Sequence, residues 1–229
     1  MIEFIDGVLE FVHDLNYSPS GTEPVPRSRL GTPVWELADL YPLQGDWSLD
    51  QYLDLDTNRL IEFTDGCLEF LPMPTRWHMI LAERFYQWLY AIVASQSLGE
   101  VHLAPLRVKI GRKTVRQPDV VWVRPEHLRG LFKPPVGAAL AMEVVSPGSQ
   151  NRARDLVQKR KEYARGGIEE YWIVDPDQSL VSVLTLAGSK YVVHGEFGMG
   201  TRATSVILKG FEVSVDELFN LPAGESLDR

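Results

Sequence analysis

Residues 142–163 read MEVVSPGSQNRARDLVQKRKEY and decide the fold of this chain. They begin inside an apolar run, AALAMEVV at 138–145, in which Glu143 is the one charged residue. Such a run predicts a buried strand. The charged residues that follow predict a helix over about 151–165, because two glycines come next and glycine commonly ends helices. The run YWIVD at 171–175 then predicts another strand.

Hydrophobic spacing predicts the elements on either side of this stretch. Apolar residues recur at helical spacing from Arg76 to about Ser95, which indicates an amphipathic helix that covers a sheet. Further strands are predicted at 101–110, 119–123, 180–186 and 190–194, and a last short helix near 214–219. This order of helices and strands indicates an α/β or α+β protein.

Two similar segments predict β-hairpins. IEFTDGCLEF at 61–70 has apolar alternation on both sides of an Asp-Gly pair, which readily takes the positive φ angles of a type I′ turn. IEFIDGVLEF at 2–11 is identical to it at 8 of 10 positions. We expect this second hairpin either to extend the sheet or to pair with a neighbouring subunit.

The N-terminal region predicts a division of the chain. Residues 17–34 are rich in Pro, Gly, Ser and Thr, which is typical of a linker or an extended arm. Ser48 and Gln51 have the spacing of a capping box and predict the start of a short helix. We therefore expect a hairpin and arm over 1–34 and one domain over 35–229.

Composition indicates a globular protein of the reducing cytoplasm. Of the 229 residues, 45% are hydrophobic and 24% are charged, an ordinary balance. Cys67 is the one cysteine, so an internal disulfide is excluded, and no Cys/His cluster has zinc spacing. The N-terminus carries acids instead of the basic region of a signal peptide, and no long apolar run follows. We therefore expect neither secretion nor a membrane span.

The charge is unevenly placed. A net charge of -8 argues against indiscriminate binding to nucleic acid, because phosphate contacts need local positive charge. Of the 23 basic residues, however, five lie within 107–116 and six within 152–165. Placement therefore matters more than the total for binding to DNA.

Two carboxylates stand in predicted apolar strands, Asp119 at the head of one and Glu143 inside another. A carboxylate in a core strand is costly to desolvate unless a cation or hydrogen bonds compensate its charge. A divalent metal shared by the two acids would account for both. The alternative is an ion pair between Glu143 and Arg107 or Lys109 on a neighbouring strand.

Asp155, Lys159 and Tyr163 recur every four residues, so they share one face of the predicted helix with Arg152. Taken alone, Asp155 and Lys159 are typical of an exposed ion pair one helical turn apart, which contributes little to stability.

Five motifs identify a family: WSLDQYLDL, RLIEFTDGCLEFLPMPTRWH, QPDVVWV, MEVVSPGSQNRARDLVQKRKEY and GGIEEYWIVDP. On these motifs, from about Trp35 to Leu218, the chain resembles the Uma-two family of restriction endonucleases in the PD-(D/E)XK nuclease superfamily. The resemblance implies a restriction-endonuclease-like core, with a mixed central sheet flanked by helices and additional hairpins near both termini.

The resemblance also implies a metal site, in which Asp119, Glu143 and the backbone carbonyl of Val144 hold Mg²⁺ or Mn²⁺. The E-x-K tripeptide of the wider superfamily reads Glu143-Val144-Val145 here, so its lysine is absent. The resemblance implies that Lys159, on the following helix, replaces it and positions the attacking water. The expected catalytic residues are therefore Asp119, Glu143 and Lys159.

Further positions match the family. Glu62 is expected as a further acid and His78 as a contact to phosphate, although each also fits a structural role, on the polar face of a hairpin and at a helix N-terminus. Asp155 is a further accessory candidate. Three basic residues are candidates for holding the DNA backbone, or else solvated surface residues: Arg112, Arg152 and Lys161.

These features together predict a Mg²⁺-dependent endodeoxyribonuclease, which we expect to be a homodimer. The main alternative is a non-catalytic DNA-binding or assembly module of the same fold, because fold does not fix activity. Glycoside hydrolysis by paired carboxylates would need a sugar cleft, and the apolar strands around the two acids argue against one.

Overall fold

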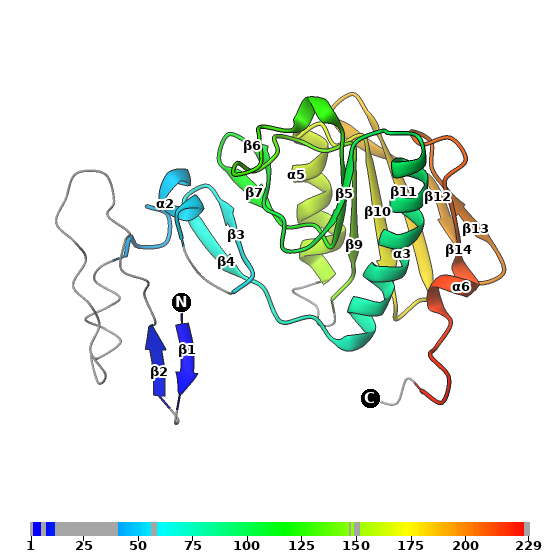
Figure 1. Cartoon of the computed structure of the whole chain (residues 1–229), viewed down its shortest axis with the longest axis horizontal. Coiled ribbons are helices and arrows are strands. Elements are labelled where there is room, and N and C mark those ends of the chain that lie inside the picture. Colours follow the sequence, from blue (N-terminus) through cyan, green and yellow to red (C-terminus); the bar gives the residue numbers. More distant parts are fainter. Residues whose placement is uncertain are drawn as a thin grey trace. The chain divides into compact units, whose positions relative to one another are not determined.

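Figure 1 shows the computed structural model, which describes residues 2–5, 8–11, 41–55, 59–146, 148 and 152–226. The chain forms two compact units, Met1–Leu71 and Pro72–Arg229. The predicted arm at 17–34 and the boundary near Trp35 lie outside the described residues. The division into 1–34 and 35–229 therefore stays a prediction.

The smaller unit contains both predicted hairpins. Strands β1 (Ile2–Ile5) and β2 (Val8–Phe11) pair antiparallel, as do β3 (Ile61–Thr64) and β4 (Cys67–Phe70). Between β3 and β4, Asp65 and Gly66 have φ angles of 47° and 83°. Two positive φ angles in succession fit the predicted type I′ turn.

Helix α2 (Leu49–Leu53) confirms the predicted capping box. The Ser48 hydroxyl accepts a hydrogen bond from the Gln51 amide at 3.1 Å, and the Ser48 amide donates to the Gln51 side chain at 2.8 Å. Tyr52 extends from this helix and donates its hydroxyl to the carbonyl of Ile61 at 2.8 Å. This bond fastens α2 to β3 within the smaller unit.

The larger unit is built around a mixed sheet, which confirms the predicted fold class. Within the described residues the sheet has six strands in the order β12-β11-β10-β9-β8-β5. Strands β9 and β10 run parallel, and the other neighbours run antiparallel. The strands are β5 (Glu100–Leu103), β8 (Val120–Val123), β9 (Leu140–Val144), β10 (Glu170–Asp175), β11 (Leu180–Ala187) and β12 (Lys190–Phe197).

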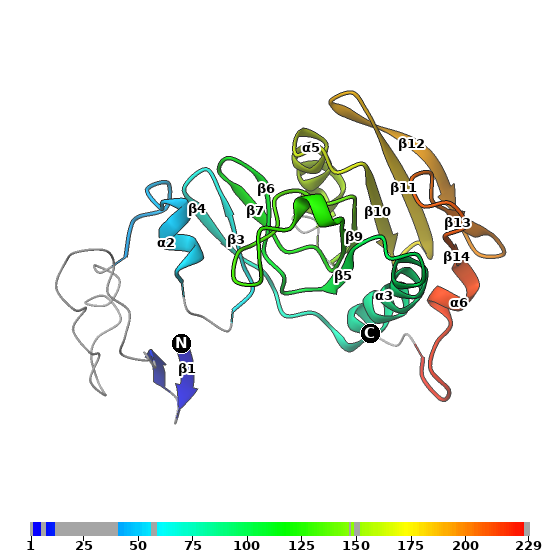
Figure 2. The same cartoon turned by 45° about the horizontal axis from the view of Figure 1, so that its top comes forward.

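Helices cover both faces of this sheet. Helix α3 (Arg76–Ser95) lies on one face and α5 (Lys159–Arg165) on the other, as Figures 1 and 2 show. Side chains alternate between the two layers, so Met142 and Val144 pack in the α3 layer while Val145 packs in the α5 layer. The same alternation directs Glu143 toward α5.

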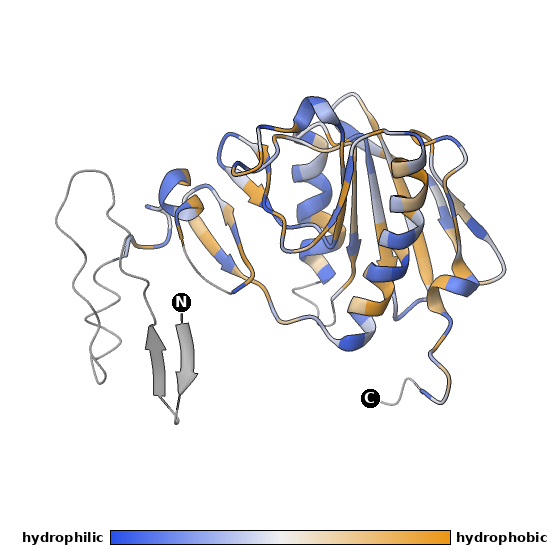
Figure 3. Ribbon diagram, viewed as in Figure 1, coloured by the Kyte–Doolittle hydropathy of each residue, from blue (hydrophilic) through white to orange (hydrophobic). Residues whose placement is uncertain are grey.

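Hydropathy agrees with this arrangement. Hydrophobic and hydrophilic residues are interleaved along both helices in Figure 3, as helices with one buried face require. Helix α3 has the predicted bounds. Within the described residues, no helix combines the length and apolar character needed to cross a membrane.

One predicted strand is wrong, because residues 101–110 form parts of two strands. Strand β5 pairs with β8, whereas β6 (Val108–Gly111) pairs with β7 (Thr114–Arg116). Pro105 lies between them and has no backbone N–H to donate, so it cannot continue the ladder. Four short elements had no sequence prediction: β7, the 3₁₀ turn η1 (Pro125–His127), β13 (Arg202–Thr204) and β14 (Glu212–Ser214).

The predicted C-terminal elements are confirmed. Strands β11 and β12 form a hairpin, and helix α6 (Val215–Phe219) follows its N-cap residue Ser214. The unpredicted strands β13 and β14 pair antiparallel. The Ser214 hydroxyl accepts a hydrogen bond from the amide of Glu217, which caps the first turn of α6.

The helix predicted over 151–165 contains a turn that the sequence did not indicate. Asn151 lies outside the described residues, and Arg154–Gln158 forms a π-helical turn, η2, before α5 begins. The Lys159 amide donates to the carbonyl of Arg154, five residues earlier. The helix ends at Gly166 and Gly167 as predicted.

Two buried tyrosines in the α5 layer make the stability of the folded protein depend on pH in the alkaline range. Tyr171 and Tyr191 donate their hydroxyls to the carbonyls of Asp155 and Ile168, at 2.9 and 2.7 Å. Burial raises the pKa of both hydroxyls, with nearby carboxylates adding to the effect. An unfolded tyrosine ionises near pH 10, so above about pH 10 the unfolded state binds fewer protons than the folded state.

We therefore expect the free energy of unfolding to fall as the pH rises above about 10. Urea unfolding from pH about 9 to 11 would measure this fall, and Tyr191→Phe should make it shallower by removing one titrating group. If the free energy of unfolding fell equally steeply with pH in Tyr191→Phe and in the parent, Tyr191 would not be one of the groups responsible.

Candidate functional site

The two predicted acids lie on neighbouring segments, Glu143 in β9 and Asp119 directly before β8. In the antiparallel register of β8 and β9, Val120 is opposite Met142, so the next step brings Asp119 opposite Glu143. The Asp119 carboxylate accepts a hydrogen bond from the Val144 amide at 2.8 Å. Strand pairing therefore joins two residues that are distant in sequence, and it fixes the orientation of Asp119.

Helix α5 supplies the partners of Glu143. Lys159 Nζ lies 2.9 Å from Glu143 Oε2, and the Tyr163 hydroxyl donates to Glu143 Oε1 at 2.5 Å. The side chains of Lys159 and Glu143 are 2% and 4% exposed. Lys161, by contrast, is exposed. Of the two lysines, the structure brings Lys159 to the acid.

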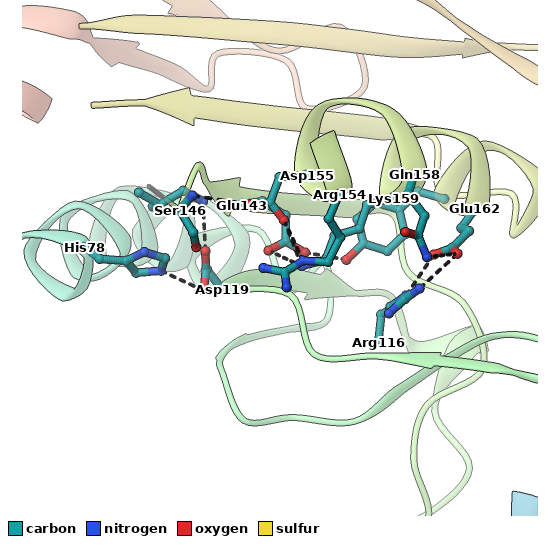
Figure 4. A network of polar contacts seen from close by, with 12 residues as sticks. His78, Arg116, Asp119, Glu143, Ser146, Arg154, Asp155, Gln158, Lys159 and Glu162 are labelled. Atoms are coloured by element: carbon teal, nitrogen blue, oxygen red, sulfur yellow. Dashed lines mark hydrogen bonds and ion pairs between the residues drawn. The ribbon is translucent and has the colours of Figure 1, made fainter. Parts of the chain in front are cut away.

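Asp155 contacts the same ammonium group in the network of Figure 4. Its Oδ1 is 3.5 Å from Lys159 Nζ and accepts a hydrogen bond from Arg154 Nε at 3.3 Å. Its Oδ2 accepts from the Ser146 amide at 3.2 Å. The expectation of an exposed ion pair is wrong, because this helix face packs on the sheet and both side chains are 2% exposed.

His78 approaches Asp119 from the first turn of α3. Its Nε2 lies 2.9 Å from Asp119 Oδ1, but the contact lacks the alignment of a hydrogen bond, so this buried nitrogen has no hydrogen-bond partner. The His78 amide donates to the Thr75 hydroxyl, the helix cap. The site therefore contains an imidazole nitrogen whose hydrogen-bonding capacity is unfilled.

The donor set suits a hard divalent cation. Asp119 and Glu143 offer carboxylate oxygens, and Mg²⁺ commonly binds one or two carboxylates while water and substrate oxygens fill its other positions. Among the residues that the structure describes, no group of three His, Cys, Asp or Glu side chains could hold a metal ion. Any ion here would therefore depend on non-side-chain oxygens, such as the Val144 carbonyl.

The three basic residues predicted to hold DNA come from three different segments of the chain. Arg112 is exposed in the turn between β6 and β7, and Lys161 is exposed on α5. Arg152 donates two hydrogen bonds to Asp175, at 2.6 and 3.1 Å. A phosphate at Arg152 would exchange one anionic partner for another.

Sequence reasoning missed a buried ion pair beside the site. Arg116 on β7 is fully buried and donates to both carboxylate oxygens of Glu162, at 2.8 and 2.9 Å, and Gln158 donates to the same carboxylate. This bidentate contact joins β7, just before Asp119, to the helix that carries Lys159. In the sequence, the one feature that could have pointed to Arg116 is its position directly before the QPD motif, Gln117-Pro118-Asp119.

Glu62 does not lie on the polar face of a hairpin, as its expected structural role required. It lies in the smaller unit, on β3, and its side chain is fully buried instead of lying on an exposed polar face. Ile61 and Phe63 are buried as well, so both faces of β3 are covered. The assumption of one solvated face fails there.

A family model described as "Uma2: Putative restriction endonuclease" matches residues 49–216, which is more than half of the chain. The chain belongs to the Uma2 family. The predicted resemblance is thus confirmed, and all the residues named above from His78 to Asp175 lie inside the Uma2 match. No curated protein matches the chain.

A crystal structure supports the Uma2 fold assignment. It is described as "a putative nuclease belonging to DUF820", from Anabaena variabilis, and superposes with a TM-score of 0.62 at 20% sequence identity. The match covers 76% of this chain and 97% of the other. Likeness at this identity shows a shared fold, so the restriction-endonuclease-like core predicted for this Uma2 protein is confirmed.

Proposed function

We propose that this Uma2 protein is a divalent-metal-dependent endonuclease that hydrolyses phosphodiester bonds in DNA. The observation that carries the proposal is the site itself: Asp119 accepts a hydrogen bond from the Val144 amide, next to Glu143, and Lys159 lies against Glu143. Membership of a family described as "Putative restriction endonuclease" supports it. The proposal includes Mg²⁺ or Mn²⁺ as cofactor, DNA as partner, a homodimeric state and a cytoplasmic location.

Asp119 and Glu143 would hold the cation, with the Val144 carbonyl as a further ligand. When bound, the cation would neutralise phosphate charge and lower the pKa of a water molecule. The Val144 amide holds Asp119 and the Tyr163 hydroxyl holds Glu143, so both carboxylates are oriented in advance. Pre-orientation of this kind is what a catalytic site requires.

Lys159 would act on the reacting groups directly. Its ammonium group has three donors, and a buried cation stabilises the negative charge that develops on phosphate more strongly than an exposed one. His78 would keep Asp119 in place or contact a phosphate oxygen. Arg112, Arg152 and Lys161 would hold the nucleic acid backbone, which positions the substrate without reading its sequence.

A non-catalytic DNA-binding or assembly module of the same fold is the second candidate. The observation that favours it is the close contact between Lys159 and Glu143, which compensates the buried acid without a metal. The two candidates differ in one measurable property, because only the catalytic one needs a divalent cation.

The metal site can be tested by two substitutions that preserve side-chain volume. Asp119→Asn and Glu143→Gln should each weaken Mn²⁺ binding by at least about tenfold while the protein stays folded, because each removes one anionic ligand. Calorimetric titration with Mn²⁺ would measure the affinity, and circular dichroism would check the fold.

Glu169→Gln is the matched control, since Glu169 is a partly exposed acid that pairs with Arg124. Its Mn²⁺ affinity should equal that of the parent. Parent-like affinity in both Asp119→Asn and Glu143→Gln would remove the basis for the metal site. Cleavage of a labelled DNA duplex that depends on Mn²⁺ and stops with a chelator would support the catalytic candidate.

A further inference from the structure

We propose that Asp155 is a positioning residue that keeps Lys159 in the active site when Glu143 binds a divalent cation, and that the π-helical turn places it there. This inference rests on the proposed function. It assigns to Asp155 a role distinct from that of Asp119 and Glu143, since Asp155 would contact the catalytic lysine and not the metal.

The π-helical turn changes which carbonyl meets Lys159. In a regular α-helix the Lys159 amide would bond to the carbonyl of Asp155, four residues earlier. Here it bonds to Arg154, and the Asp155 carbonyl accepts the Tyr171 hydroxyl at 2.9 Å. Tyr171 lies on β10, so this bond fastens the turn to the sheet. Single π turns inside helices are frequent at functional sites.

The Asp155 side chain is anchored independently of the lysine. The Ser146 amide, just beyond β9, donates to Oδ2, and Arg154 donates to Oδ1. Asp155 is therefore a fixed acceptor rather than a mobile surface acid.

Charge explains why the lysine needs this second acceptor. Glu143 and Asp155 carry two negative charges, Lys159 and Arg154 carry two positive charges, and all four residues are buried. A divalent cation on Glu143 would repel the Lys159 ammonium group, which lies 2.9 Å from that carboxylate. Asp155, 3.5 Å away on the same helix, supplies the attraction that holds the ammonium group in the site.

A kinetic experiment separates positioning from metal binding. Asp155→Asn should lower the single-turnover rate of duplex cleavage with Mn²⁺ by about tenfold or more, while KM for DNA and the affinity for Mn²⁺ change by less than about twofold. Tyr171→Phe should change the rate in the same direction by less. Asp216→Asn is the matched control and should behave as the parent. Asp216, in the first turn of α6, accepts a hydrogen bond from the Gly200 amide and has no contact with Lys159 among those described.

A spectroscopic experiment tests the same inference without turnover. Nitrogen NMR of the lysine ammonium groups should show a protected Lys159 signal in the parent, assigned by its loss in Lys159→Met. That signal should persist when Mg²⁺ is added to the parent, and it should broaden when Mg²⁺ is added to Asp155→Asn. If Asp155→Asn does not fold, Tyr171→Phe gives the corresponding comparison.

The outcomes distinguish this inference from the proposed function. A parent-like rate and a persistent Lys159 signal in Asp155→Asn with Mg²⁺ would overturn it. Loss of Mn²⁺ affinity in proportion to the rate would overturn it too, since Asp155 would then act on the metal site. A parent that binds Mg²⁺ but cleaves no DNA would remove the proposed function alone, and the NMR comparison would still decide the role of Asp155.

Discussion

Replacing Lys159 by alanine is expected to abolish metal-dependent DNA cleavage, with a loss of at least about a hundredfold in rate. The reason is that Lys159 is buried against Glu143, where no other lysine of α5 can take its place. Lys161 is two residues further, a rotation of about 200° around the helix, and its side chain is exposed. Lys161→Ala should keep the rate and weaken only substrate binding.

Single-turnover cleavage of a labelled duplex with Mn²⁺ would measure both variants. Lys159→Ala and Lys159→Met both remove the buried cation that Glu143 and Asp155 share, so both are expected to lose stability. Lys159→Met keeps the aliphatic stem and therefore should lose less packing than Lys159→Ala. Mn²⁺ affinity should not fall in either variant of Lys159, because Lys159 does not coordinate the metal and its positive charge opposes a cation on Glu143. Lys161→Ala should reduce the dependence of log binding constant on log salt by about one unit.

Two results would count against this assignment of the lysine. A rate for Lys159→Ala equal to that of the parent would reject Lys159 as the catalytic lysine. A parent protein that cleaves no nucleic acid with any divalent cation would instead favour the non-catalytic module.

The elements that were predictable from the sequence are those whose pattern lies within one segment. Helix α3 follows from apolar residues at helical spacing, and the β3–β4 hairpin follows from Asp65 and Gly66, which tolerate the positive φ angles of its turn. The strand predicted over 101–110 fails for a local reason as well, since Pro105 interrupts it and the apolar pattern alone hides the break.

The candidate site was less predictable, because its geometry depends on contacts between segments. The resemblance named Asp119, Glu143 and Lys159, but the register of β8 and β9 is what brings the two acids together. The spacing of residues along a regular α-helix does not predict the π turn, which leaves the Asp155 carbonyl to accept the Tyr171 hydroxyl. The Arg116 contact to Glu162 joins strand β7 to helix α5, which are distant in sequence, so the pattern within either segment does not predict it.

The structure also contains a buried carboxylate that the proposed chemistry does not use, Glu170 at the start of β10. Its Oε1 accepts from the Trp172 indole at 2.6 Å and from the Ser205 hydroxyl at 2.7 Å. Its Oε2 accepts from the amides of Val206 and Ile207, at 2.7 and 3.2 Å. One fully buried side chain thus satisfies four donors and fastens the segment after β13 to the sheet.

Glu170→Ala is therefore expected to destabilise the protein by about 4 kcal/mol, because buried donors that lose their acceptor cost about 1–3 kcal/mol each. A loss of this size is a large part of the total for a domain, which is about 5–15 kcal/mol. The neighbouring Glu169→Ala should cost less than about 1 kcal/mol, since Glu169 makes a partly exposed ion pair with Arg124. Urea unfolding at neutral pH would compare the two variants with the parent. A difference of less than about 1 kcal/mol between Glu170→Ala and Glu169→Ala would show that the four bonds contribute no more than a surface contact.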